Sequence, residues 1–262
     1  SYDPNGNCIT LRTEGEIDDA PGDTNNVRLA EQTFQYDAMN RLTIRGTNFF
    51  NTATQAPIDD GASSSSIVYS GTSQPLLVTD DNGHTTSYTY DSVNRLTIHG
   101  DKFGNTRTYT YDGNSNVTGV TATDLSGLGL PDQVFTTTYA YDALNRLTLS
   151  TDSSGNAQSS GYDSRDNRVR VIDATGHESR YAYDGLDRLT LAIVDLDGDG
   201  ADGDGLDTVT TNGWDDNSRL ATRTDDNGNR TTYSYDPLNR PAFVNYPDGT
   251  SDSFNFLRPL IG

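Results

Sequence analysis

One feature of this 262-residue sequence constrains its fold more than any other: a short motif headed by an aromatic residue returns along most of the chain. Its full form is Tyr-Asp-x-x-Asn-Arg-Leu, as in Tyr90–Leu96. From Tyr69 to Phe256, which falls in step at the end, the aromatic residues lie 21, 21, 30, 21, 21, 31, 21 and 21 positions apart. Self-similarity at a short period indicates a repeat protein, in which each unit packs on its neighbours. The anchors are Tyr36, Tyr69, Tyr90, Tyr111, Tyr141, Tyr162, Tyr183, Trp214 and Tyr235, and the motif arginines are Arg41, Arg95, Arg146, Arg188, Arg219 and Arg240.

Each short unit has the pattern of two strands and two turns. Residues 95–99 and 106–111 alternate between two faces, and residues 101–105 between them are rich in turn formers. This alternation, bounded by Gly, Asn and Asp, is typical of an antiparallel hairpin. A Gly recurs seven residues before the next anchor, where a turn that needs positive φ explains it, and an Asp recurs ten before, where its side chain can cap the turn. The turn glycines are Gly83, Gly104, Gly155, Gly176, Gly228 and Gly249.

The composition requires an unusual way of folding. Leu, Ile, Val and Phe make up about a fifth of the chain and the net charge is -20, a combination that otherwise predicts disorder. Hairpins stacked edge to edge into one continuous sheet solve this problem, because each unit buries its apolar face against its neighbours. The predicted fold class is therefore all-β, an array of antiparallel β-hairpins. We expect the anchors to form a ladder, ring on ring with the hydroxyls in water, and the motif Arg and Asp to form ion pairs between repeats.

The spacing also predicts how the chain is organised. We expect a single repeat module over residues 1–262, with less regular repeats and acidic inserts in 1–68 and regular triplets in 69–262. Two short units and one long unit sum to 72 or 73 residues. If three hairpins make one turn of a spiral, the long loops line up on one side, which suits a tube or fibre better than a closed capsule.

Several function classes are disfavoured. The charge of -20 argues against nucleic acid, no stretch approaches the roughly 20 apolar residues of a membrane span, and Cys8 is the only cysteine. No nucleophile elbow, phosphate-binding loop or dinucleotide fingerprint occurs. His84 and His177 occupy a turn position that is Asn in other units, and His99 lies on a strand. We therefore expect no enzymatic activity, no nucleic-acid partner and no membrane span in this segment.

One acidic loop is a candidate metal site. Asp195, Asp197 and Asp199, followed by Gly200, match the opening of an EF-hand-type calcium loop, in which alternating carboxylates converge on a hard cation. The match then fails, because the twelfth position is Leu206. Two interpretations stay open, a structural Ca²⁺ site or a solvated acidic loop, and no other cofactor is predicted. The candidate ligands are Asp195, Asp197, Asp199, Asp202, Asp204 and Asp207.

The repeated Tyr-Asp-x-x-Asn-Arg-Leu and the Gly-Asn turn at fixed spacing resemble the YD-repeat, or Rhs-repeat, family. Its members include Rhs polymorphic toxins, shell components of insecticidal toxin complexes, bacterial wall-associated proteins and teneurins. The resemblance implies a large secreted or cell-surface protein whose hairpins spiral into a hollow β-walled shell, which encloses an effector in toxin members. The family's self-cleaving Asp-Pro-x-Gly-Leu type motif is missing here, and the sequence has the character of a segment from a longer polypeptide.

The sequence therefore favours a non-catalytic structural scaffold, forming the β wall of a shell or an extracellular tube or fibre. One alternative is a calcium-dependent glycan-binding or adhesive module, since rows of Tyr can bind sugars. Another is a toxin-encapsulating shell with its effector encoded downstream. The expected partners are neighbouring repeats, further copies of the chain, an enclosed cargo domain or a glycan.

Overall fold

The computed structural model describes residues 1–15, 26–59, 61–126, 130–196 and 207–254. Within these ranges the chain forms twenty β-strands and no helix, so none of them holds a helix able to cross a membrane. The chain divides into two compact units, Ser1–Thr136 and Thr137–Gly262. The predicted all-β fold class is confirmed.

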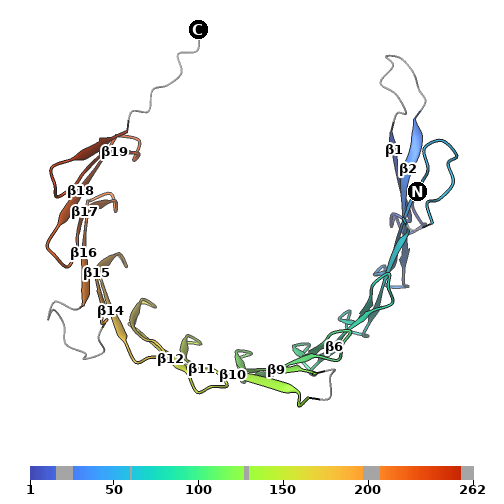
Figure 1. Cartoon of the computed structure of the whole chain (residues 1–262), viewed down its shortest axis with the longest axis horizontal. Coiled ribbons are helices and arrows are strands. Elements are labelled where there is room, and N and C mark those ends of the chain that lie inside the picture. The colour runs from blue at the N-terminus through green and yellow to red at the C-terminus, as the bar shows by residue number, and fades with distance from the viewer. Residues whose placement is uncertain (16–25, 60, 127–129, 197–206, 255–262) are drawn as a thin grey trace, which may run out of the picture. The chain divides into compact units, whose positions relative to one another are not determined.

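The strands of the first unit pair in chain order, each antiparallel to the next (Figure 1). Across three of them, for example, Tyr88 lies opposite His99 and His99 lies opposite Arg107. The strands are β1 (Thr10–Gly15), β2 (Val27–Tyr36), β3 (Leu42–Phe49), β4 (Ser63–Tyr69), β5 (Pro75–Thr79), β6 (Thr85–Tyr90), β7 (Leu96–Gly100), β8 (Thr106–Tyr111) and β9 (Val117–Asp124). The unit boundary falls within β10 (Gln133–Tyr141).

The second unit repeats this arrangement, and each of its strands again pairs antiparallel with the next. The strands are β11 (Leu147–Thr151), β12 (Ala157–Tyr162), β13 (Arg168–Ile172), β14 (Glu178–Tyr183), β15 (Leu189–Val194), β16 (Thr208–Trp214), β17 (Leu220–Thr224), β18 (Arg230–Tyr235), β19 (Pro241–Asn245) and β20 (Ser251–Ser253). The hairpin array expected from the 21-residue spacing is therefore present in both units.

The strand register slips by one residue at each aromatic anchor. Between Thr89 and Tyr90 the pairing shifts, so that Tyr90 lies opposite Leu96. The same shift precedes Tyr111 and Tyr162. A β-bulge of this kind bends a strand and redirects its side chain. The Leu of the motif is therefore the cross-strand partner of the anchor in its own motif.

Neither unit has a closed apolar core within the described residues. Phe50 is the one buried hydrophobic side chain there, and no large side chain is fully buried. The guanidinium of Arg28 lies 3.6 Å from the centre of the Phe50 ring. Cohesion within each unit comes from contacts between neighbouring strands, as the aliphatic-poor composition predicts.

Candidate functional site

The repeated motif folds into a five-residue turn that starts at its Asp, here called the Tyr-Asp turn. In one copy the backbone N–H of Asp91 donates to the carbonyl of Arg95 at 2.9 Å, and the N–H of Asn94 donates to the carbonyl of Asp91 at 3.0 Å. Oδ1 of Asp91 accepts the backbone N–H groups of Val93 and Arg95. The Asp thus caps the turn with its own side chain. These turns span residues 37–41, 70–74, 91–95, 112–116, 142–146, 163–167, 184–188, 215–219 and 236–240.

The fourth residue of each Tyr-Asp turn has left-handed backbone geometry, which the sequence analysis missed. Asn94 has a φ of 66°. Asn and Asp tolerate this conformation better than most residues, because their short polar side chains bond locally. The recurring Asn before the Arg was the signal that could have revealed this role. The residues are Asn40, Ser73, Asn94, Ser115, Asn145, Asp166, Asp187, Ser218 and Asn239.

The ion pair of the motif lies within one turn, so the prediction of pairs between repeats was wrong for the motif Asp and Arg. Nε of Arg95 donates to Oδ2 of Asp91 at 2.7 Å. The backbone N–H and the guanidinium of Arg95 together hold the pKa of Asp91 below its usual value. The short loop between the two residues brings them together, so no neighbouring repeat is needed. The same pair forms at residues 37 and 41, 142 and 146, 184 and 188, 215 and 219, and 236 and 240.

The Arg nevertheless links its repeat to the next one through its other nitrogen. Nη1 of Arg95 donates to the carbonyl of Asp112 at 3.0 Å and to Oγ of Ser115 at 3.2 Å, both in the following Tyr-Asp turn. Its guanidinium lies 4.6 Å from the centre of the Tyr111 ring. One Arg therefore bonds the Asp of its own turn, lies over the ring of the next anchor and donates hydrogen bonds to the next Tyr-Asp turn. Arg41, Arg146, Arg188 and Arg219 cover Tyr69, Tyr162, Trp214 and Tyr235 in the same way.

Several anchor hydroxyls donate to a backbone carbonyl, a bond that the sequence analysis did not predict. The hydroxyl of Tyr111 donates to the carbonyl of Leu96, 15 residues earlier, at 2.6 Å. Burial raises the pKa of this hydroxyl. Trp214 replaces the hydroxyl with its indole N–H, which donates to the carbonyl of Leu189 at 2.9 Å. Each anchor is the last residue of its strand, which places its polar tip over the preceding strand. Tyr36, Tyr162, Tyr183 and Tyr235 make equivalent bonds.

The second kind of turn, here called the Gly turn, has the same backbone pattern, and its fifth residue bonds back to the residue that starts it. It also has contacts outside itself, since Asn105 accepts the N–H of Leu125 and Lys102 lies 3.4 Å from the ring nitrogens of His84 in the preceding Gly turn. In the turn at 101–105 the N–H of Gly104 donates to the carbonyl of Asp101 at 3.1 Å, and Gly104 has a φ of 88°. Nδ2 of Asn105 donates to Oδ2 of Asp101 at 2.8 Å. The predicted roles of the recurring Gly and Asp are confirmed. Gly turns span residues 80–84, 101–105, 152–156, 173–177 and 225–229, and Gly249 holds the same place in 246–250.

The histidines occupy the positions expected of them. His84 closes its Gly turn with a backbone N–H to Oδ1 of Asp80, and His177 does the same with Asp173. The ring of His99 lies 5.3 Å from that of Tyr88 on the neighbouring strand. His84 and His177 therefore belong to Gly turns, and His99 packs against a ring on the neighbouring strand.

The candidate metal loop is described only at its two ends. Asp197, Asp199, Asp202 and Asp204 lie outside the described residues. Asp195 and Asp207 lie within them and are 6% and 5% exposed. In the part of the chain that the structure describes, no three His, Cys, Asp or Glu side chains gather as a metal cluster. The calcium site stays a prediction.

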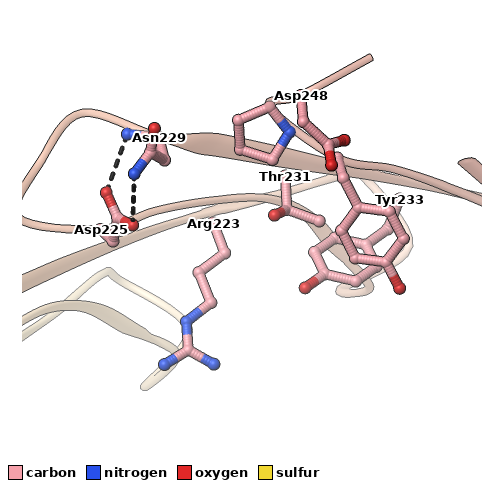
Figure 2. A pocket seen from close by; sticks show the side chains of 8 residues that line it. Arg223, Asp225, Asn229, Thr231, Tyr233 and Asp248 are labelled. Atoms are coloured by element: carbon pink, nitrogen blue, oxygen red, sulfur yellow. Dashed lines mark hydrogen bonds between the residues drawn. The ribbon is translucent and has the colours of Figure 1, made fainter. Parts of the chain in front are cut away.

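An open groove of about 720 Å³ lies over β17 and β18 of the second unit. Figure 2 shows Arg223 and Tyr233 projecting into it, beside the Asp225–Asn229 pair of a Gly turn. The hydroxyl of Tyr246, also in the lining, donates to Oδ2 of Asp252 at 2.8 Å. The groove therefore combines two aromatic rings with an exposed guanidinium.

A family model described as RHS Repeat matches residues 162–199 and 214–251, which contain the repeats headed by Tyr162 and Tyr183 and those headed by Trp214 and Tyr235. No curated protein matches the sequence.

Among solved structures the chain is similar to one described as the crystal structure of TcdB2-TccC3-Cdc42, with 14% identity and a TM-score of 0.43, over 94% of this chain and 15% of that chain. It is also similar to the Photorhabdus luminescens Tc holotoxin pore, with 11% identity and a TM-score of 0.30, over 95% of this chain and 20% of that chain. A porin-like protein from Bacteroides uniformis has 15% identity and a TM-score of 0.30, over 91% and 95% of the two chains.

Proposed function

Because this chain belongs to the Rhs-repeat family, we propose that it is a non-catalytic structural scaffold of a large secreted or cell-surface protein. Its hairpins wind into the β wall of a hollow shell or an extracellular tube. One observation carries the proposal: the bonds that hold each repeat run to the next repeat along the chain. Arg146 shows this, since it contacts the ring of Tyr162 at 4.7 Å and donates to the carbonyl of Asp163 at 2.8 Å.

This kind of bonding suits a wall. A globular enzyme folds around a closed core, and its active site depends on residues brought together from distant parts of the chain. Here the recurring contacts join residues 15 to 30 positions apart, such as Tyr162 with Leu147 and Arg188 with Ser218. The stability of the array is then close to a sum of contributions from neighbouring units. The array can therefore grow longer without a larger hydrophobic core. Such a chain can cover an area or enclose a volume.

The shape of the full-length protein tests the proposal. Electron microscopy of the intact protein should show a hollow envelope or a tube with a wall one sheet thick. A compact particle without a lumen, or strands stacked face to face in two layers, would contradict it. A closed envelope and an open tube differ in whether both ends are capped, which the same images resolve.

Toxin members of the family suggest a more specific form of this proposal, in which the wall encloses a cargo domain. If the full-length protein carries a downstream effector domain, that domain should resist added protease while the wall is intact. It should be cleaved after the wall is opened by denaturant at a concentration that leaves the isolated domain folded. Cleavage at equal rates in both conditions would argue for an open scaffold.

The groove of Figure 2 favours glycan binding as a second function. Tyr rings can stack on the apolar faces of sugars, while Arg223 and Asp248 offer hydrogen bonds to hydroxyl groups. The bond from Tyr246 to Asp252 holds one of these rings in place. A glycan array with the full chain tests this function, with Tyr246→Ala expected to abolish any signal. Tyr2→Ala, at a 72% exposed Tyr outside the groove, is the control and should leave the signal unchanged.

A further inference from the structure

Two buried aspartates flank the long acidic loop where it leaves and rejoins the sheet. β15 ends at Val194 and β16 begins at Thr208, and these residues are cross-strand partners. Continued by one residue, this register sets Asp195 opposite Asp207, and opposite residues of an antiparallel pair share one face of the sheet. They are the two buried polar or charged residues of the described chain, at 6% and 5% exposed. Like charges directly opposite each other destabilise a strand pair unless something lies between them.

The carboxylate of Asp207 has no protein partner. Both of its oxygens are buried, and neither makes a hydrogen bond. A buried carboxylate without hydrogen bonds or a counter-charge is costly, so such groups are paired, bind a cation or lose their charge. The other aspartates of this repeat array contrast with it, since those that start the turns each accept several N–H groups.

The nearby carboxylate of Glu178 is an example of a charge in this sheet that has hydrogen-bond partners. The N–H of Asp195 donates to the carbonyl of Glu178, which places Glu178 beside it on β14. Arg170 and Arg180 both donate to the Glu178 carboxylate and lower its pKa to about 2. No arginine performs this task for Asp207 among the described residues. Glu178 is therefore neutralised by two arginines, whereas the buried carboxylate of Asp207 makes no hydrogen bond.

We propose that Asp195 and Asp207 bind a hard divalent cation of the Ca²⁺ type, which closes the base of the loop and ties β15 to β16. Opposite residues of an antiparallel pair have Cα atoms about 4.5–5.5 Å apart, and Ca²⁺ binds carboxylate oxygens at about 2.3–2.6 Å, so one ion fits between the two side chains. The site adds a ligand to the scaffold and goes beyond the proposed wall function. It rests on these two residues alone.

The other long unit provides a matched comparison. Its insert leaves the sheet at Asp124, the last residue of β9, and returns by way of Asp132. Both of these carboxylates are exposed, so water satisfies them. The same kind of insert, with the same charges at its ends, therefore has no need of a cation in the first unit. Burial, rather than acidity, distinguishes the proposed site.

Calorimetric titration of the chelator-treated full chain with CaCl₂ tests the proposal. We expect saturable uptake and a rise in melting temperature with Ca²⁺. Asp207→Asn should weaken binding by at least about 10-fold, since mutation of even an outer partner of a metal ligand commonly costs that much. Asp124→Asn is the control, and its affinity should stay within about 2-fold of the parent, because an exposed carboxylate is outside the site.

A second measurement separates loss of the site from loss of the fold. Without Ca²⁺, Asp207→Asn should melt no lower than the parent, because it removes an unpartnered buried charge and keeps the side-chain shape. With Ca²⁺, only the parent and Asp124→Asn should melt higher. The proposal is overturned if the parent shows neither uptake nor a melting shift, if Asp207→Asn binds as tightly as the parent, or if Asp124→Asn weakens binding equally.

Discussion

The Tyr-Asp turns and the Gly turns have the same backbone but play different parts in the array. Except at Ser70 and Tyr246, both begin with an Asp, which accepts the N–H groups of the third and fifth turn residues in the turns at 215–219 and 225–229. Both place the fourth residue at positive φ. They differ in the fifth residue. In the turn at 215–219 it is Arg219, which reaches Asn239 of the following Tyr-Asp turn at 2.8 Å. In the turn at 225–229 it is Asn229, which bonds back to Asp225.

Side chains at the fifth position join the Tyr-Asp row from one repeat to the next, whereas Asn105, Asn156 and Asn229 of the Gly row bond back to their own Asp. An Arg satisfies its own Asp with Nε and extends Nη1 to the next turn. Asn167 does the same with its one amide, which bonds both Asp163 and, in the following Tyr-Asp turn, Asp187. Only the Tyr-Asp row is also next to an aromatic anchor that a guanidinium can cover. We therefore expect substitutions in this row to weaken the array, and matched substitutions in the Gly row to have local effects.

The anchor itself should produce the largest effect. Tyr235→Ala removes a ring packed under Arg219 and a hydrogen bond to the carbonyl of Leu220, and should lower the free energy of unfolding by about 2–4 kcal/mol. Tyr235→Phe, which removes only the hydrogen bond, should cost about 1 kcal/mol. Urea unfolding measures both. Leu238→Ala, at a 71% exposed position of the adjacent turn, should change stability by less than about 0.5 kcal/mol.

Acid should remove the stabilisation that Glu178 supplies next to the Gly turn at 173–177. Because its pKa falls from 4.5 to about 2 in the folded chain, its contribution is complete above about pH 4.5 and is lost as the pH falls toward 2. A fall of this size corresponds to about 3 kcal/mol for this largely buried side chain. Urea midpoints from pH 7 to pH 2.5 should therefore fall less steeply in Glu178→Gln than in the parent. Parallel curves for the two proteins would contradict this assignment.

Weakening the contacts of Arg219 with the next repeat should lower the free energy of unfolding by a smaller amount. Arg219→Lys keeps the charge but cannot bond Asp215 and Asn239 together while covering Tyr235, and should cost about 1–2 kcal/mol. Asn229→Ala in the next Gly turn breaks only the bond to Asp225 and should cost about 0.5 kcal/mol. Equal losses in these two variants would remove the distinction between the rows.

Exchanging Gly and Asn for each other at positive φ should have the smallest effect. Gly83 has a φ of 77° with open space where a Cβ would lie, so Gly83→Asn should cost less than about 1 kcal/mol. Asn94→Gly should change stability by a few tenths of a kcal/mol, because strain relief offsets the added freedom of the unfolded chain. Gly83→Val should cost about 1–2 kcal/mol, since a β-branched residue tolerates this geometry poorly. Urea midpoints of the three variants check these values.

The fold of this chain could be predicted well because its signals are local. Alternation along residues 106–111 and a Gly followed by Asn at 104–105 depend on a few consecutive side chains, and the spacing then orders the hairpins. The candidate site could be predicted in part. The anchors and arginines were identified, but the sequence analysis placed the Asp91–Arg95 pair between repeats because counting residues does not show which atoms a five-residue turn brings together.

The sequence by itself determined where strands and turns occur and that neighbouring hairpins pair, since both follow from short-range pattern and turn chemistry. Only the tertiary structure decided what lies across each strand: the carbonyl of Leu96 under the hydroxyl of Tyr111, the guanidinium of Arg95 over its ring, and the burial of Asp207. These depend on how far a side chain extends over the adjacent strand and on what excludes water there. The order of residues in a repeat states neither how far a side chain extends over the adjacent strand nor which side chains water can reach.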